Sequence, residues 1–170
     1  SDLKREATPK LSIGVTYDYN DRAARERGNL GGYVADTAYS SLNTTFVDLM
    51  FKYNGLSVAA EYANKQINGD RLVDAEDNFI SNYYTGSGTA VQAGYLLPSN
   101  LEFAARYTTI APEKASGRDL QDMYTIGVSK YIVGHYLKIQ SDFSYLVETD
   151  QFTYEEAGEF IYRFQVELAF

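Results

Sequence analysis

Apolar and polar residues alternate along most of this chain with a period of two. The clearest example is residues 160–170, where every even position carries an apolar or aromatic side chain. Successive side chains of a β-strand point to opposite faces, so this alternation predicts a strand with one apolar face and one polar face. The polar face of this strand would carry Arg163, Gln165 and Glu167.

The same pattern recurs often enough to predict an all-β chain of eight strands. The expected strands cover residues 10–20, 45–53, 56–62, 90–97, 101–107, 124–129, 137–145 and 160–170. The connections between them are alternately long and short. Long polar loops are expected at residues 21–43, 67–84, 111–121 and 148–158.

The short connections have the composition of tight turns. Asn54 and Gly55 join the second and third expected strands, and an Asn-Gly pair supplies the two positive φ angles of a two-residue hairpin. Long loops on one side and short turns on the other are typical of a transmembrane antiparallel up-and-down β-barrel. We therefore expect residues 1–170 to form one such barrel domain, or part of one, with both chain ends on the turn side.

The composition supports β-structure, but it does not distinguish a soluble protein from a membrane barrel, so the strand pattern has to do so. Sixteen Tyr and nine Phe among 170 residues favour pleated sheets. The mean hydropathy of -0.34 suits a soluble domain, but membrane barrels also look polar on average because half of each strand faces the lumen. No run of about eighteen apolar residues is present, which excludes a transmembrane helix. The net charge of -8 argues against a nucleic-acid partner.

Outward-facing aromatic residues fall at two levels along the expected strands. Those toward the loop ends are Tyr17, Tyr19, Tyr62, Tyr107 and Tyr145, and those toward the turn ends are Tyr53, Tyr95 and Phe170. Two aromatic belts are expected where a barrel crosses both membrane interfaces. A soluble lipocalin-like barrel, with its apolar face inward and cross-strand aromatic pairs in a core, is the alternative.

Three stretches of the chain resemble a known family. Thr45–Tyr62, Val91–Leu97 and Tyr124–Lys138 resemble the phosphate-selective porin O/P family, and most closely its members from Bacteroidetes-type bacteria. The resemblance implies a place in the outer membrane of a Gram-negative bacterium. Members of this family are trimeric channels of about sixteen strands, within the range known for outer-membrane barrels. The chain therefore corresponds to a C-terminal half, and either pairs with a missing N-terminal half or closes alone as eight strands.

Charged residues on the polar face of the expected strands are the candidates for lining a pore. They are Lys52, Glu61, Glu102, Arg106, Lys138, Asp142, Arg163 and Glu167. Acids and bases are close to balanced, whereas an anion pore uses an excess of Lys and Arg. In a closed eight-stranded barrel the same residues would be a packed network of ion pairs without a pore.

The first long loop contains the strongest candidates for anion binding. Arg22, Arg25 and Arg27 would line a constriction if the loop folds inward, because guanidinium groups bind phosphate through paired hydrogen bonds. The alternative is a solvated surface loop that touches lipopolysaccharide. Acidic segments at residues 70–77 and 148–156 would offset any attraction of anions.

An enzyme is not expected. His135 is the only histidine and lies in a predicted turn, so neither a histidine-based triad nor a multi-histidine metal site can be assembled. No metal or cofactor is expected either. The expected function is an outer-membrane porin for passive diffusion of small hydrophilic or anionic solutes such as phosphate, in contact with membrane lipid and lipopolysaccharide and assembled as a homotrimer. The alternative is a closed eight-stranded structural or surface-interaction barrel without a conducting pore.

Overall fold

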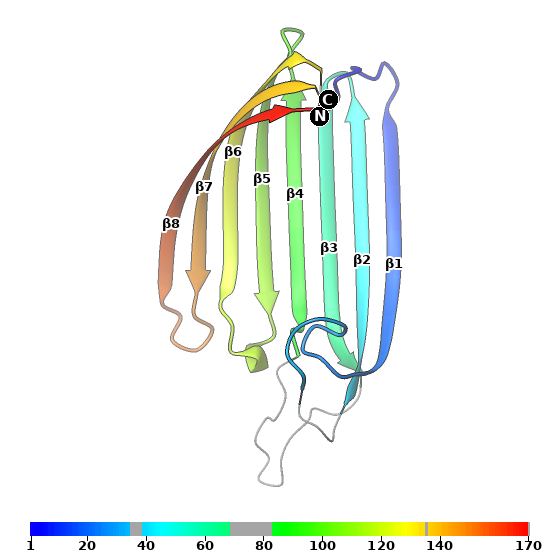
Figure 1. The fold of residues 1–170 in the computed structure, drawn as a ribbon, viewed down its shortest axis with the longest axis vertical. Helices are drawn as coiled ribbons and strands as arrows, with labels where there is room; N and C mark the ends of the chain where they lie inside the picture. The colour runs from blue at the N-terminus through cyan, green and yellow to red at the C-terminus, as the bar shows by residue number, and fades with distance from the viewer. Residues whose placement is uncertain (35–38, 69–82, 135, 170) are drawn as a thin grey trace.

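The structure, a computed structural model, describes residues 1–34, 39–68, 83–134 and 136–169. It consists of a single antiparallel sheet in which eight strands follow one another in chain order (Figure 1). One short 3-10 helix, η1 (Lys114–Ser116), lies between the fifth and sixth strands. The strands are β1 (Lys10–Ala23), β2 (Ser40–Tyr53), β3 (Leu56–Asn68), β4 (Gly86–Leu96), β5 (Leu101–Pro112), β6 (Leu120–Val133), β7 (Leu137–Thr149) and β8 (Glu156–Leu168).

The prediction of eight up-and-down strands is confirmed, and the strands are longer than the apolar alternation indicated. β2 begins at Ser40, and β1 continues to Ala23 through a register shift after Asn20. Arg22 therefore lies in a strand, at a φ of 46°, and its prediction as a loop residue was wrong. Backbone pairing needs no apolar side chain, so the ladder continues where the alternation stops.

Short turns and long loops lie at opposite ends of the sheet. Both ends of the described chain are at the turn end (Figure 1). The β2–β3 turn has the predicted form, since φ is 46° at Asn54 and 89° at Gly55. Three features of the sequence interpretation lie outside the described residues: His135, Phe170 and the acidic segment 70–77.

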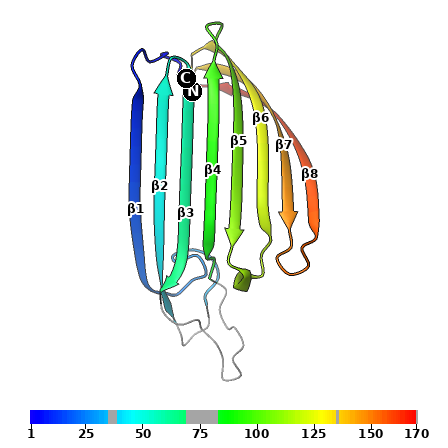
Figure 2. The same ribbon diagram turned by 180° about the vertical axis from the view of Figure 1, so that it is seen from behind.

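The sheet is curved but open. Among the described residues, β1 pairs only with β2 and β8 only with β7. Figures 1 and 2 show the two edge strands on opposite sides of the sheet. The closed eight-stranded barrel that was one alternative is thus not the arrangement seen. Each edge presents a row of backbone donors and acceptors to a further strand.

The two faces of the sheet differ in character. The outer face carries the apolar positions of the alternation and is largely uncovered: Val15 is 70% exposed, and Phe160 and Tyr162 are each 67% exposed. The accessible surface is 10969 Å², whereas a compact monomer of this mass exposes about 8,400 Å². Within the described part of the chain, the sheet therefore has no second layer of the kind that a soluble domain would place over its apolar face.

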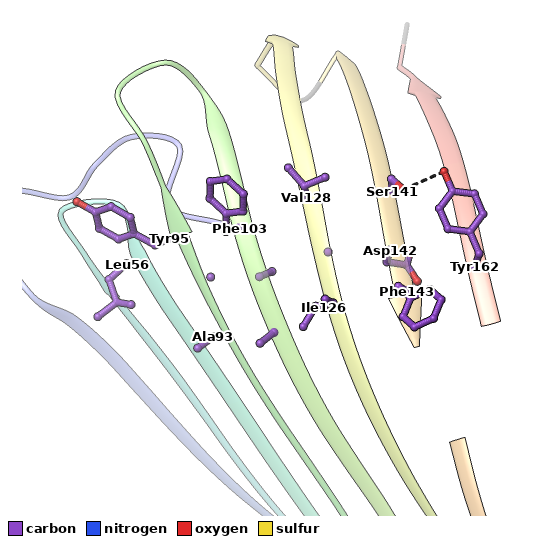
Figure 3. A pocket seen from close by; sticks show the side chains of 14 residues that line it. Leu56, Ala93, Tyr95, Phe103, Ile126, Val128, Ser141, Asp142, Phe143 and Tyr162 are labelled. Carbon is purple, nitrogen blue, oxygen red and sulfur yellow. Dashed lines mark hydrogen bonds between the residues drawn. The ribbon is translucent and has the colours of Figure 1, made fainter. Parts of the chain in front are cut away.

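A shallow groove runs over the outer face of β3 to β8 and holds about 630 Å³. Figure 3 shows Tyr95 and Phe143 toward opposite sides of the groove, with Phe103, Val128 and Ile126 between them. Within the groove, the side-chain hydroxyl of Ser141 donates a hydrogen bond of 3.1 Å to the hydroxyl of Tyr162. The hydroxyl of Ser141 is thus partnered within the sheet.

Aromatic residues form a continuous row on the outer face of β5 to β8. Tyr107, Tyr124, Tyr145 and Phe160 are direct cross-strand partners. The ring centroids of Tyr107 and Tyr124 are 5.1 Å apart, and those of Tyr145 and Phe160 are 4.6 Å apart. Such pairs add to sheet stability beyond the area they bury.

We predict that Gly55→Ala destabilises the fold by about 1 kcal/mol more than Gly117→Ala, since both replace a glycine at positive φ but only one adds a clash. A Cβ at Gly55 would lie 2.6 Å from the carbonyl oxygen of Leu96, and a Cβ at Gly117 would meet nothing within 4 Å. Urea unfolding of the two variants measures the difference in the free energy of unfolding. Equal losses would show that the approach to Leu96 carries no strain.

Candidate functional site

The inner face of the sheet carries all eight side chains predicted to line a pore. Strand register places Glu61 opposite Asp48, Arg106 opposite Thr125 and Asp142 opposite Arg163. The same register puts Lys52, Glu102, Lys138 and Glu167 on this face. The alternation of the sequence was therefore sufficient to group them.

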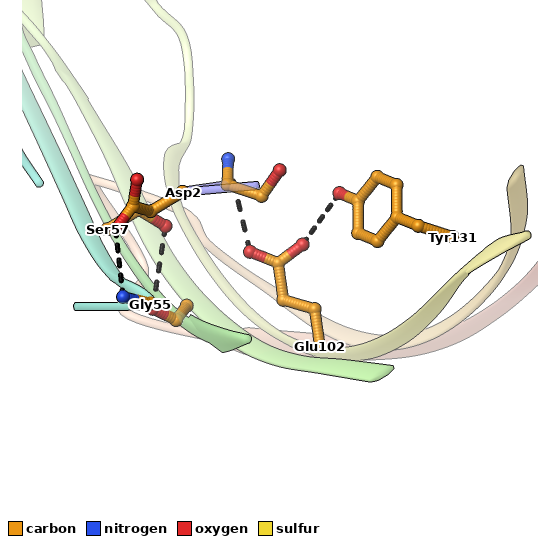
Figure 4. A network of polar contacts seen from close by, with 7 residues as sticks. Asp2, Gly55, Ser57, Glu102 and Tyr131 are labelled. Atoms are coloured by element: carbon orange, nitrogen blue, oxygen red, sulfur yellow. Dashed lines mark hydrogen bonds and ion pairs between the residues drawn. The ribbon is translucent and has the colours of Figure 1, made fainter. Parts of the chain in front are cut away.

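The turn end of the inner face is crossed by the N-terminal residues. The buried carboxylate of Asp2 accepts a hydrogen bond of 2.8 Å from the backbone N–H of Gly55 and one of 3.0 Å from that of Glu6 (Figure 4). The guanidinium of Arg5 donates to the carbonyl oxygen of Leu96 at 2.7 Å. Residues 2–6 thus form a strap that ties the β2–β3 turn to the end of β4.

Glu102 is next to this strap and is buried on the inner face. Its Oε2 accepts a hydrogen bond of 2.7 Å from the hydroxyl of Tyr131 (Figure 4). Nearby, Lys138 and Glu167 form an ion pair of 2.9 Å across β7 and β8. The predicted lining residues at this level are therefore engaged in structural contacts.

The middle of the inner face is divided by charge. Asp48 and Glu61 are direct cross-strand partners on β2 and β3, an arrangement that places two carboxylates side by side. Arg106 on β5 and Arg163 on β8 occupy the middle of the other half. Like charges directly opposite one another destabilise a sheet. The Asp48–Glu61 pair therefore does not contribute to the stability of the sheet, and its presence needs another explanation.

A polar recess of about 310 Å³ lies in the basic half and spans β4 to β8. Arg163 donates a hydrogen bond of 2.9 Å from Nε to Oδ1 of Asp142, and its Nη2 forms an ion pair with the same oxygen, also at 2.9 Å. The recess brings three of the predicted lining residues together, and its other polar lining residues are Gln92, Thr125, Ser129, Gln140 and Gln165.

Arg106 differs from Arg163 in having no ion pair among the described residues. Its Nε atom is buried and has no hydrogen-bond acceptor within the described part of the chain. The hydroxyls of Thr125 and Ser144 hydrogen-bond to each other at 2.8 Å, so the cross-strand neighbour Thr125 is already engaged. The recess therefore carries one positive charge that the sheet does not neutralise locally.

The first long loop folds inward over the loop end of β2 and β3. Val34 packs with Leu42 and Tyr83 in an apolar cluster on this face. The Tyr83 hydroxyl donates to the carbonyl oxygen of Ala23 at 2.7 Å and accepts from the backbone N–H of Ser40 at 3.0 Å. Lys65 donates to the carbonyl oxygen of Arg27 at 2.9 Å. The loop thus lies inside the mouth of the curved sheet.

The three loop arginines of the sequence interpretation have separate surroundings. Arg22 in β1 is exposed and 3.9 Å from Asp21. Arg25 stacks on Tyr33, with its guanidinium carbon 4.2 Å from the ring centroid, and donates to the carbonyl oxygen of Gly31 at 2.9 Å. Arg27 stacks on Tyr84 at 4.6 Å. No contact joins the three side chains among the interactions of the described residues.

Tyr84 is a contact point that the sequence interpretation missed. Arg118, from the β5–β6 connection, stacks on the Tyr84 ring at 3.6 Å and donates to its hydroxyl. Gln151 from the β7–β8 loop donates to the carbonyl oxygen of Arg118 at 2.6 Å. Loops far apart in the sequence are therefore linked at the mouth, and the Tyr83-Tyr84 pair in a polar segment was the one signal for it.

The β7–β8 loop has its own local order. The carboxylate of Asp150 accepts hydrogen bonds of 2.7 Å from the backbone N–H groups of Phe152 and Thr153. The Thr153 and Phe152 amides lower the pKa of Asp150 below its usual range. The charged carboxylate of Asp150 therefore stabilises the loop at neutral pH. This stabilisation is lost only as the pH falls through the lowered pKa of Asp150.

Neither a metal-type cluster nor a spanning helix is found in the described residues. No group of three or more His, Cys, Asp or Glu side chains is positioned to hold a metal ion there. No helix in that part of the chain is long and apolar enough to cross a membrane. Comparison of the chain with protein-family models, curated proteins and solved structures finds no match. The resemblance to the porin O/P family stays an interpretation of the sequence.

We predict that Tyr83→Phe loosens the first loop, because it removes hydrogen bonds to Ala23 and Ser40 that are worth about 1–2 kcal/mol in a buried setting. Trypsin should then cleave the folded protein after Arg25 or Arg27 about tenfold faster, as 1.4 kcal/mol corresponds to a factor of ten. Tyr154→Phe is the matched control, since that side chain is 72% exposed. Equal cleavage of both variants would contradict the role of the Tyr83 hydroxyl.

Proposed function

We propose that this sheet is a wall segment of a transmembrane β-barrel in a bacterial outer membrane, and that the barrel is a porin-like channel for passive diffusion of small hydrophilic solutes. The observation that carries the proposal is the contrast between the faces. The outer face is apolar and aromatic with no covering layer, and the inner face carries Arg106, Asp142, Arg163 and the other charged side chains.

Lipid supplies the missing cover. An exposed apolar face of this extent is unfavourable in water, at roughly 25 cal/mol for each Å². In a bilayer the same face is solvated by acyl chains, and the outer tyrosines lie where barrels place interfacial aromatic belts. The strands contain 11 to 14 residues, enough for tilted strands to cross the hydrocarbon core, which takes about 9–11.

The open edges indicate a larger ring. Inside lipid, the backbone groups of β1 and β8 must be paired, and eight strands alone leave an interior only wide enough for side chains. A ring completed by further strands, as the family resemblance implies, would leave an aqueous lumen over the inner face. A homotrimer of such rings is the assembly that the resemblance suggests.

Charge would set the selectivity of this channel. The inner face carries the acids Asp48 and Glu61 in one half and the bases Arg106 and Arg163 in the other. This mixture favours neutral solutes and weakly charged ones, and anions such as phosphate would pass along the basic half. The role of the Arg22, Arg25 and Arg27 group as one anion constriction has no geometric support.

We predict that lipid contacts the outer face alone. The chain contains no Trp, so one introduced Trp reports one position. Val91→Trp on the outer face should be strongly quenched by lipids with brominated acyl chains, and Gln92→Trp on the inner face should retain most of its fluorescence. Equal quenching of the two neighbours, or none, would contradict a membrane-spanning sheet.

We predict discrete ion-conducting steps when the purified, folded protein is added to planar lipid bilayers. The polar inner face supplies a wetted path, and both signs of charge on it predict weak selectivity, measured by the reversal potential in a salt gradient. Absence of steps from protein that is folded in lipid would reject the channel and favour a structural or surface-interaction barrel. Heat-denatured protein is the control.

A further inference from the structure

We propose that the recess around Arg106 is a binding site for a small hydroxylated monocarboxylate, such as a sugar acid, within the lumen. This inference rests on the proposed channel function and names the class of solute that the channel would favour. The starting observation is the buried Nε of Arg106, which has no acceptor among the described residues.

The charge of the recess matches one negative charge. Asp142 accepts a hydrogen bond from Nε of Arg163 and forms an ion pair with its Nη2, so these two charges neutralise each other. Arg106 adds a single positive charge without an ion pair in the described part of the chain. A planar guanidinium binds a planar carboxylate through two parallel hydrogen bonds. Because the Asp142–Arg163 pair is neutralised, the recess has one net positive charge, which a single carboxylate balances.

The remaining lining matches hydroxyl groups. Gln92, Gln140 and Gln165 line the recess from β4, β7 and β8, and each amide offers both donors and an acceptor. A hydroxyl group is also both a donor and an acceptor, so it can donate a hydrogen bond to a glutamine amide or accept one from it. A bare inorganic anion would contact Arg106 and leave these amides to water.

The size of the recess agrees with an organic solute. Its volume of about 310 Å³ is at the lower end of the range of about 300–1,000 Å³ that small-molecule pockets occupy. The hollow exists because Ala104 and Gly127, direct cross-strand partners, form its floor. A Cβ at Gly127 would already approach the Cβ of Asp142 at 3.3 Å, whereas a larger residue at 104 would fill the recess.

Isothermal titration of gluconate into the folded, lipid-reconstituted protein tests the site directly. We expect saturable binding that Arg106→Gln weakens tenfold or more, as expected for loss of a charged hydrogen-bonding partner. Ala104→Leu should weaken it similarly by filling the recess. Inorganic phosphate and glucose should each bind at least tenfold more weakly than gluconate. Lys138→Gln is the control, because that lysine pairs with Glu167 outside the recess.

Equal affinity of the wild-type protein and Arg106→Gln, or tighter binding of phosphate than of gluconate, would overturn the proposal. If Arg106→Gln fails to fold, Ala104→Leu and Gln140→Leu give the same test without removing a charge. Titration needs no conductance, so gluconate binding without channel steps would reject the channel and keep the site. Channel steps without gluconate binding would reject the site and keep the channel.

Discussion

Backbone pairing holds this sheet together, and the whole structure depends on where that pairing ends. The ladder is continuous from β1 to β8, and each strand follows its chain neighbour. None of the residues that the structure describes forms a second layer on the outer face, so side-chain burial contributes little there. A sheet of this kind is stable where its edges are paired and its apolar face is solvated by something other than water. Both requirements would be met by the closed ring in lipid that we propose.

Small residues on the inner face control how charged side chains are placed. Gly14 lies under the carboxylate of Asp48, since a Cβ there would be 2.4 Å from Oδ1, and Gly94 lies under that of Glu102, at 2.7 Å. The carboxylates therefore lie along the wall over a neighbouring strand. A side chain held against the wall takes up less of the lumen than one projecting from it. A glycine likewise leaves room for the recess beside Asp142, where Gly127 forms part of the floor.

Much of the fold followed from alternation, because a strand has only two faces. Placing Arg106, Asp142 and Arg163 on one face required no knowledge of register, only of parity. The distance between them did require register, which a single sequence leaves open. The strap of Asp2 and Arg5 and the stacking of Arg118 on Tyr84 had no periodic signal at all. These contacts join segments far apart in the chain, so local patterns could not predict them.

The error at Arg22 has the same origin. Apolar alternation marks the part of a strand whose face must be buried or lipid-solvated, and β1 continues beyond it through polar residues to Ala23. Loop lengths read from polarity were therefore too long, and the arginines were grouped in one loop. The structure divides them between a strand end and an inward-folded segment with different partners.

The docked first loop also makes the mouth one-sided. Its apolar cluster and the Lys65 contact cover the loop end of β2 and β3, which is the half that carries Asp48 and Glu61 farther down. In a channel, a solute arriving from the loop side would meet β5 to β8 before it met those carboxylates. The first loop, held by the Tyr83 hydroxyl, the apolar cluster and Lys65, would therefore make the entrance of a channel asymmetric.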